Sequence, residues 1–422
     1  MVSAKSSCEP AYFSCWRKIH TYSFIILNDI KDSNDDMDDG GLVEIRKRLL
    51  LPLQEYKEED TYGRKDCVLS SAVEYLPGSA HYTQGVLWSP DGTCVLTSVV
   101  EQSVSGESYR MVVHDVDGNG LISPEGKDLG KNQGTEGIYS YAWFPHANRE
   151  DPSSFCYAVA RRGHPVHVYD ACGDGSSRGS YVAVDERMDE MDSIYSIAFN
   201  HTGQYLYGGG RRRGVIYGFD TSQPGRNSFT FMWDQAEQRD GIISRICCGK
   251  YALENVVAVG TYGKRIGLFD VYSNGMMCVL EGHIGGVTHM EFSADGNYLY
   301  TGARKDGSIY CWDVRYLSGS VYKIERESKK SNQKIYFDIE PAGRCLASGG
   351  DTGIVQLYDL TDGSPAGSFR GASDVVNGCC FHPSEVLLAT SSGERSFHIE
   401  GDEEEESSSC SVSVWSFPTT TL

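Results

Sequence analysis

The sequence predicts an all-β protein built from seven similar repeats, with a disordered segment at its N-terminus. Three observations support this: short apolar stretches separated by polar turns, a repeat of 43 to 55 residues, and Gly at 47 of 422 positions. That glycine share exceeds the usual level of about 7% and indicates many turns. Lys and Arg number 38 against 58 Asp and Glu, so the net charge is −20. Any contact with a nucleic acid therefore requires a local basic patch.

Each repeat contains a first strand, a turn that often ends in Gly, a second strand, a polar turn and a third strand with a characteristic ending. The seven endings are His114-Asp115, Tyr169-Asp170, Phe219-Asp220, Phe269-Asp270, Trp312-Asp313, Tyr358-Asp359 and Trp415-Ser416. Strands and Gly turns at this period are typical of four-stranded propeller blades. The repeat therefore predicts a seven-bladed β-propeller.

The fifth repeat is nearest to the WD consensus. Gly282-His283 precedes the stretch FSADGNYLYTGARKDGSIYCWD, which begins at Phe292. In this arrangement His283, Asp306 and Trp312 are expected to form a structural hydrogen-bonded set rather than a catalytic one. The fold prediction is therefore a seven-bladed WD-repeat β-propeller.

The domain organisation follows from charge and from strand counting. Residues 1–60 carry acidic runs with nothing to bury and are expected to be mostly disordered, so the propeller spans 61–422. The last repeat ends at Phe417 without a fourth strand, whereas residues 67–75 precede the first repeat without a blade of their own. We expect 67–75 to close the last blade, because this removes the open sheet edges. The acidic loop 400–409 within that blade is either solvated, or repels nonspecific RNA, or contacts a basic partner.

The motifs of several other protein classes are missing from the sequence. No apolar run approaches the roughly 18 residues of a membrane span, and no signal peptide is recognisable. There is no GxSxG, P-loop or HExxH motif, and the 14 Cys have neither CxxC nor zinc-ligand spacing. We therefore expect a non-enzymatic protein with no metal, no cofactor, no membrane contact and reduced intracellular thiols.

Basic residues gather in the turns between the second and third strands of repeats two to five. Nine of the 38 Lys and Arg residues fall there: Arg161, Arg162, Arg211, Arg212, Arg213, Lys264, Arg265, Arg304 and Lys305. The corresponding turns of repeats one, six and seven carry Glu101, Asp351 and Glu394. Since these turns share one face of a WD propeller, the pattern predicts a basic arc over about half the rim of an acidic disc.

Two aromatic residues are predicted to lie beside the arc. Tyr139 and Tyr195 each precede the anchor of a first strand by four residues, which places both near the same mouth of the channel. Basic groups for phosphates, interleaved with rings for splayed bases, suit a looped RNA. A rim that binds acidic protein segments and a rim of plain solvated turns remain the alternatives.

Several longer strings resemble one known family. They are GHIGGVTHMEFSADGNYLYTGARKDGSIYCWDVR from Gly282, QKIYFDIEPAGRCLASG from Gln333, FHPSEVLLATSSGERSF from Phe381, GIYSYAWF from Gly137, PVHVYDA from Pro165 and DGIIS from Asp240. Together they are similar, in the same order over roughly residues 80–400, to the telomerase Cajal body protein family.

The resemblance implies a nuclear, RNA-binding, non-enzymatic assembly and localisation factor. Members of that family bind a short box in the terminal loop of box H/ACA small Cajal-body RNAs and carry them, and telomerase RNA in animals, to Cajal bodies. The implied partners are these RNAs, the telomerase ribonucleoprotein and other proteins of H/ACA particles or Cajal bodies, and a cytoplasmic share stays open. The positions that match the family's motifs are Arg162, Lys264, Arg304 and Lys305. The alternative is a WD-repeat scaffold that binds acidic peptides without RNA.

Overall fold

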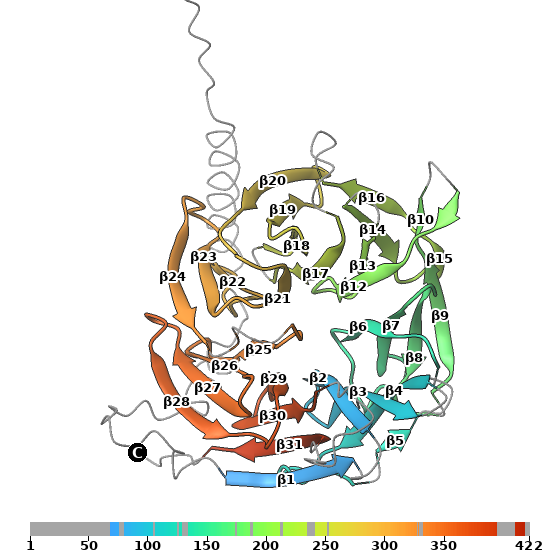
Figure 1. The fold of residues 1–422 in the computed structure, drawn as a ribbon. Coiled ribbons are helices and arrows are strands. Elements are labelled where there is room, and N and C mark those ends of the chain that lie inside the picture. The colour runs from blue at the N-terminus through green and yellow to red at the C-terminus, as the bar shows by residue number, and fades with distance from the viewer. Residues whose placement is uncertain are drawn as a thin grey trace, which may run out of the picture.

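Seven sheets surround a common axis in the computed structural model (Figure 1). The structure describes residues 68–75, 80–103, 106–124, 126–128, 134–173, 175–185, 189–211, 214–233, 241–250, 253–326, 328, 332–394 and 410–417. Every regular element in these ranges is a β-strand. The prediction of an all-β, seven-bladed propeller is therefore confirmed. The segment 1–60 and the acidic loop 400–409 lie outside the described residues.

The first three blades use strands in chain order, with the first strand of each blade nearest the axis. Blade one contains β2 (Ala80–Trp88), β3 (Cys94–Ser103), β4 (Gly106–Asp115) and β5 (Lys127–Asp128). Blade two contains β6 (Ile138–Trp143), β7 (Cys156–Arg161), β8 (Val166–Asp170) and β9 (Ser177–Val182), with β15 (Gly225–Arg226) added outside. Blade three contains β12 (Ile194–Phe199), β13 (Tyr205–Gly210), β14 (Val215–Asp220) and β16 (Phe229–Met232). A separate hairpin pairs β10 (Val184–Asp185) with β11 (Glu190–Met191).

The remaining blades repeat this arrangement. Blade four contains β17 (Ile243–Cys248), β18 (Val256–Thr261), β19 (Ile266–Asp270) and β20 (Gly275–Leu280). Blade five contains β21 (Val287–Phe292), β22 (Tyr298–Ala303), β23 (Ser308–Asp313) and β24 (Ser320–Glu325). Blade six contains β25 (Phe337–Ile339), β26 (Cys345–Ser348), β27 (Ile354–Asp359) and β28 (Pro365–Arg370). Blade seven contains β29 (Val376–Phe381), β30 (Leu387–Ser392), β31 (Cys410–Ser416) and β1 (Val68–Tyr75).

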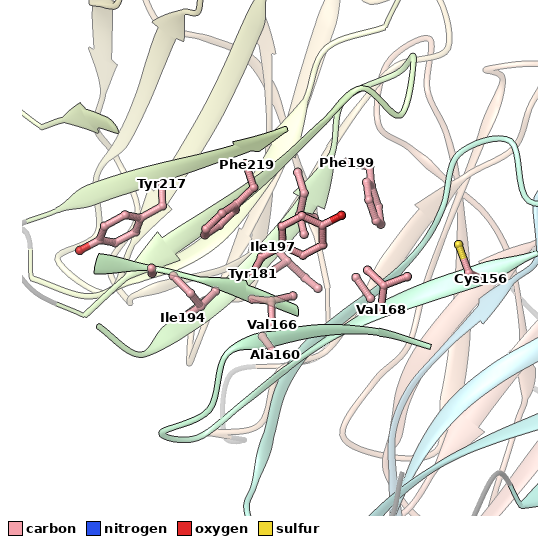
Figure 2. Close-up of a cluster of buried hydrophobic side chains, with 13 residues drawn as sticks. Cys156, Ala160, Val166, Val168, Tyr181, Ile194, Ile197, Phe199, Tyr217 and Phe219 are labelled. Atoms are coloured by element: carbon pink, nitrogen blue, oxygen red, sulfur yellow. The ribbon is translucent and has the colours of Figure 1, made fainter. Parts of the chain in front are cut away.

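The core lies between neighbouring blades. Each second strand is covered on both faces, so β7 and β18 are buried at every position, whereas the outer strand β24 is mostly exposed or half-buried. Figure 2 shows one such layer, in which Val166, Val168 and Tyr181 of blade two pack against Ile197 and Phe219 of blade three. Burial of an aliphatic or aromatic side chain contributes about 1.5–3 kcal/mol, so these interfaces are the main source of stability.

Hydroxyl groups connect the inner strands across blade boundaries. The Ser140 hydroxyl accepts a hydrogen bond from the backbone N–H of Ile197 at 3.2 Å, and Ser196 does the same for Ile246 at 2.8 Å. These buried backbone donors face a neighbouring blade rather than a partner strand, and the serines satisfy them. The bonds fix each inner strand relative to the next.

The two ends of the propeller meet in blade seven. β1 pairs with β31 in antiparallel register from Val68–Ser416 to Tyr75–Cys410. The sequence placed this closing strand at 67–75. Asn377 of the same blade accepts the N–H of Gly85 at 3.1 Å and donates to the carbonyl of Thr83 at 2.6 Å, which joins blade seven to blade one.

Deleting residues 411–417 should abolish cooperative unfolding, because the deletion removes β31, the partner of both β1 and β30. Circular dichroism and a urea titration measure this. Deleting 418–422 is the matched control and should leave the unfolding midpoint nearly unchanged, since it removes no strand of the described sheets. A 411–417 deletion that unfolds like the full chain would contradict the closed seven-blade ring.

Candidate nucleic-acid interface

The basic turns lie directly beside the starts of the inner strands. The N–H of Arg162 donates to the carbonyl of Gly137, and the N–H of Arg304 donates to that of Gly286, both at 2.9 Å. These equivalent bonds hold the turn of each blade next to the first residue of its inner strand. The turn face is therefore also the face on which the central channel opens.

A β-bulge determines which side chains project at this mouth. The pairing register of the inner strand shifts at one residue in five blades, four positions before each anchor. The bulged residues are Tyr139, Tyr195, Ser244, Thr288 and Asn377. A bulge leaves one residue unpaired and turns its side chain out of the sheet's alternation. Blades two and three thus place a tyrosine where the other three place a small or amide side chain.

The two tyrosines stack on each other. The ring centroids of Tyr139 and Tyr195 lie 4.3 Å apart with an interplanar angle of 17°. Burial, followed by the contact with Tyr195, raises the pKa of Tyr139 to about 12, although the positive charges of Arg162 and Arg211 oppose the shift. The pair is therefore an aromatic platform whose Tyr139 ring is neutral and lies near two cations.

Three further side chains complete a ring around the mouth. The Arg304 guanidinium donates to the Tyr262 hydroxyl at 2.8 Å and lies 4.4 Å from the centre of its ring. The ammonium group of Lys334, at the entry to blade six, donates to the carbonyl of Tyr139 in blade two at 3.3 Å. We call Tyr139, Tyr195, Tyr262, Arg304 and Lys334 the mouth ring.

Four of the predicted basic residues are well placed for a ligand. The side chains of Arg162, Arg211, Lys264 and Lys305 are exposed on the turn face. Lys264 and Lys305 have φ of 74° and 50°, a left-handed conformation that costs a non-glycine residue about 1–2 kcal/mol.

Two other predicted basic residues, Arg161 and Arg265, are not fully exposed. Arg161 is not an exposed turn residue: it ends β7, is only 7% exposed, and donates to the carbonyls of Tyr109 and Glu136. Its neighbour Arg162 lies beyond the end of β7, in the turn, and is exposed. Arg265 is partly covered, with its guanidinium 3.9 Å from Glu281 and 6.0 Å from the ring centre of Trp233.

Arg212 and Arg213 lie outside the described residues. The described part of the basic arc is therefore Arg162, Arg211, Lys264, Arg265, Arg304 and Lys305.

The opposite side of the same face is acidic. Burial, followed by the charges of Asp374 and Asp351, raises the pKa of Glu394. These three carboxyl groups belong to the turns of blades six and seven and the link between them. A polyanion would therefore meet attraction over blades two to five and repulsion over blades six and seven.

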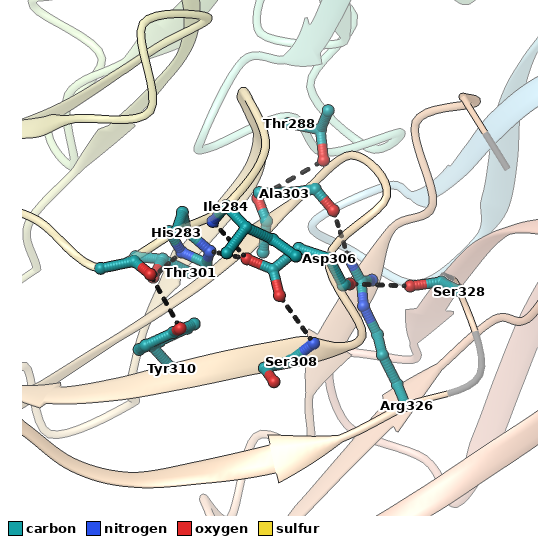
Figure 3. A network of polar contacts seen from close by, with 12 residues as sticks. His283, Ile284, Thr288, Thr301, Ala303, Asp306, Ser308, Tyr310, Arg326 and Ser328 are labelled. Atoms are coloured by element: carbon teal, nitrogen blue, oxygen red, sulfur yellow. Dashed lines mark hydrogen bonds and ion pairs between the residues drawn. The ribbon is translucent and has the colours of Figure 1, made fainter. Parts of the chain in front are cut away.

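A buried network supports the turn of blade five (Figure 3). The Trp312 indole donates to the Thr301 hydroxyl at 2.8 Å, and that hydroxyl lies 2.9 Å from His283 Nε2. His283 Nδ1 lies 2.8 Å from Asp306. Because burial lowers the pKa of His283, the imidazole is neutral, and the chain of donors runs from Trp312 through Thr301 and His283 to Asp306.

The Asp306 carboxylate also accepts two backbone N–H groups, from Ile284 and Ser308, at 3.1 Å each. Burial raises the pKa of Asp306, but the bond to His283 and these N–H groups outweigh it, so its pKa is lowered. The network is structural: it fixes the backbone that carries Arg304 and Lys305.

Below the mouth, inner strands enclose a cavity of about 290 Å³. Arg245 and Tyr336 line it, as do Lys250 and Glu291, which form an ion pair at 3.4 Å. No motif in the sequence points to Arg245, Tyr262 or Lys334. Only the position of Tyr262, at the start of the turn that carries Lys264, could have indicated one of them.

Comparison with known proteins places the chain in a class. Residues 275–313 and 363–399 match the family model "WD domain, G-beta repeat". Telomerase Cajal body protein 1 of Bos taurus is 33% identical over 344 residues, which are 79% of this chain and 62% of that protein. The Homo sapiens protein of the same name is 33% identical over 79% of this chain and 61% of its own length. Guanine nucleotide-binding protein negative regulator 1 of Schizosaccharomyces pombe is 28% identical over 76% of this chain and 81% of its own length.

Fold and matches define a WD-repeat β-propeller protein. Within that class the chain is a relative of the telomerase Cajal body proteins, which confirms the resemblance found in its sequence. It spans about three fifths of the length of these animal relatives. In the part of the chain that the structure describes, no helix is long and apolar enough to cross a membrane, and no three potential metal ligands cluster.

Replacing Thr301 with Val should lower the free energy of unfolding by about 2 kcal/mol, because His283 and Trp312 each lose a buried hydrogen-bond partner. Urea denaturation measures this. Thr390→Val in blade seven is the matched control and should cost less, since Thr390 accepts a bond from Trp415 without a histidine beside it. Equal losses of unfolding free energy in the two variants would show that the bond between Thr301 and His283 adds no stability.

Replacing Asp338 with Asn should stabilise the protein increasingly as the pH rises from 4 to 7. Burial, followed by the charge of Glu291, raises the pKa of Asp338 to about 7, although Phe381 N–H, Ile339 N–H and Lys250 oppose the shift. An unfolded Asp ionises near pH 4. The folded state therefore holds its proton longer, and wild-type stability falls over that range.

The difference between D338N and wild type should not exceed about 4 kcal/mol at pH 7, since each unit of pKa is worth about 1.4 kcal/mol. Unfolding free energies at several pH values measure it. Asp362→Asn, at a position where hydrogen bonds with Ser364 lower the pKa, should lack this trend. A pH-independent effect of D338N would mean that the pKa of Asp338 is the same in the folded and unfolded states.

Proposed function

We propose that this protein is a non-enzymatic RNA-binding scaffold that binds box H/ACA small Cajal-body RNAs and directs them to Cajal bodies in the nucleus. One observation carries the proposal. On a chain of net charge −20, stacked tyrosines and exposed cations converge at one channel mouth. Cations hold phosphates and aromatic faces hold unstacked bases, which is the chemistry that a looped RNA requires.

The relatives support the particular assignment. Proteins named telomerase Cajal body protein 1 cover most of the chain at 33% identity. Their name supports an association with telomerase and with Cajal bodies. We further propose telomerase RNA, the telomerase ribonucleoprotein and proteins of H/ACA particles as partners, as the sequence resemblance implies. We assign RNA contacts to four basic residues because they lie in the turns of the basic arc and match the family's motifs: Arg162, Lys264, Arg304 and Lys305. We add Arg211 because its charge acts on Tyr139.

An acidic peptide is the second candidate ligand of the same face. The fission-yeast relative is named as a regulator of a protein, and isolated cations pair with carboxylates as well as with phosphates. The stacked Tyr139–Tyr195 platform favours RNA, because an acidic segment has no ring system to use it.

Replacing Arg162, Arg211 or Lys305 with Gln should each weaken RNA binding and reduce the slope of log K against log salt by about one. Each lost phosphate contact releases one counterion fewer. Tyr195→Leu should instead cost about 1–3 kcal/mol with little change in slope. Fluorescence anisotropy of a labelled H/ACA loop at several salt concentrations measures both.

Lys127→Gln is the control, because Lys127 lies on the outer strand β5 and pairs with Asp115 at 3.4 Å. It should change neither affinity nor slope. Equal effects at Lys127 and Lys305 would indicate diffuse electrostatics, and no effect at the three arc residues would reject this face as the RNA site.

Replacing Lys305 with Gly separates folding from binding. Gly adopts the left-handed backbone at Lys305 without steric strain, so the free energy of unfolding should rise, by up to about 1 kcal/mol. RNA affinity should fall, because the charge is lost. Thermal denaturation and anisotropy measure the two effects. A variant that loses stability, or that keeps full affinity, would show that Lys305 serves the fold rather than the ligand.

Crosslinking in cells tests the identity of the RNA. Under the proposal, H/ACA RNAs dominate the sequences recovered with the wild-type chain and decline with Arg211→Gln. Recovery of no RNA, with an acidic protein retained instead, would favour the peptide scaffold.

A further inference from the structure

Three cations lie at the mouth of the channel and just below it, and no acidic side chain of the described residues pairs with any of them. Arg304 belongs to the turn of blade five, Arg245 lines the cavity from blade four, and Lys334 enters from blade six. Burial, followed by the positive charges of Arg304 and Arg245, lowers the pKa of Lys334 to about 7. Lys334 thus lies close enough to both arginines for their charges to disfavour its own.

The contacts of these cations with described residues are all to neutral groups. Lys334 donates to a backbone carbonyl, and Arg304 donates to a tyrosine hydroxyl. Arg245 faces the ring of Tyr336 at 5.9 Å. The Nε atoms of Arg245 and Arg304 are both buried without a hydrogen-bond partner.

The nearest acidic group of the cavity is already paired. Glu291 lines the same cavity, but its carboxylate lies 3.4 Å from the ammonium group of Lys250. Buried donors without partners and like charges held together both raise the free energy of the folded state. A bound anion would remove both costs at once.

We propose that Arg245, Arg304 and Lys334 form an axial site for one phosphate group at the channel mouth. A phosphate carries one charge as a backbone diester and up to two as a terminal or free group, and its oxygens sit on a tetrahedral centre. It can therefore face two guanidinium groups and an ammonium group from different directions, whereas the two oxygens of a carboxylate lie in one plane. The phosphate comes either from the backbone of the bound RNA, in which case the site rests on the proposed function, or from a free phosphate compound.

If the site binds an anion, removing one of its cations should raise thermal stability and lower anion affinity. Lys334→Met removes a buried charge whose folded pKa lies below that of an unfolded lysine, so the unliganded variant should melt at a higher temperature than wild type at pH 7. The same variant should bind the anion at least about tenfold more weakly.

Pyrophosphate and the full chain, without RNA, provide the direct test by isothermal titration calorimetry. Wild type should bind pyrophosphate, while Lys334→Met and Arg245→Gln should each lose at least about tenfold in affinity. Arg245→Lys keeps the charge without the guanidinium fork and covers the case in which Arg245→Gln fails to fold. Arg226→Gln is the charge-matched control, because Arg226 pairs with Asp189 at the outer edge and should bind as wild type does.

The pH dependence gives a readout that general loss of structure would not. Sulfate, which does not titrate between pH 6 and 9, should bind more weakly as the pH rises and Lys334 loses its proton. The other charged side chains near Lys334 are Arg245 and Arg304, and a guanidinium group does not lose its proton in this pH range. Burial lowers the pKa of His289 far enough to keep it neutral, and burial raises the pKa of Tyr139 to about 12. The trend should vanish in Lys334→Met.

Competition with the labelled RNA identifies the source of the phosphate. Displacement of RNA by pyrophosphate assigns the site to an RNA phosphate, and simultaneous binding assigns it to a free phosphate compound; either result supports the site. Absence of pyrophosphate binding, or equal binding by wild type, Lys334→Met and Arg245→Gln, would overturn it. Loss of RNA binding in the arc variants alone bears on the proposed function and leaves this site intact.

Discussion

The ladder between β1 and β31 is the constraint on which the rest of the molecule depends. It joins residues 68–75 to residues 410–416 and makes blade seven a complete four-stranded sheet. Once the ring is closed, every blade has two neighbours and its middle strands are covered on both faces. Closure also sets the position of the mouth, because Lys334 reaches the carbonyl of Tyr139 across the channel, 195 residues earlier in the chain. An open ring would leave the same residues on separate blades with no common site.

The β-bulge of the inner strands has two roles in the closed ring. The inner-strand bulge provides small hydroxyl or amide side chains that connect blades, as Ser244 does with the carbonyl of Val287 at 2.5 Å, and Asn377 does with blade one. In blades two and three the same position holds the stacked tyrosines. The turns show a similar division, since Asp306 is buried and fixes the backbone while the adjacent Lys305 is exposed. Buried structural residues and the exposed residues that we assign to RNA therefore alternate along the same short segments.

Periodicity explains why so much of the fold could be predicted from the sequence. Repeated anchors and strand endings identify seven blades, and counting strands identifies the closing segment. Four arc residues lie on the predicted face because a turn position is determined by the repeat. The repeat does not determine which of two adjacent residues is buried. Arg161 and Arg162 are neighbours in the sequence, and Arg161 is buried only because β7 ends at it. The Tyr139–Tyr195 stack, and the approach of Lys334 and Arg245, depend on contacts between blades distant in sequence, which no local pattern records.

The central claim is that RNA meets this protein at the channel mouth, on the face defined by the basic arc. Photocrosslinking of a 4-thiouridine-substituted H/ACA loop to the full chain, followed by peptide mass spectrometry, tests it most directly. If RNA binds at the mouth, crosslinks are expected on peptides that contain Tyr139, Tyr195 or Tyr262, and unlabelled loop should compete with them. Crosslinks confined to outer strands such as β5, β24 or β28, or distributed evenly over the surface, would contradict it.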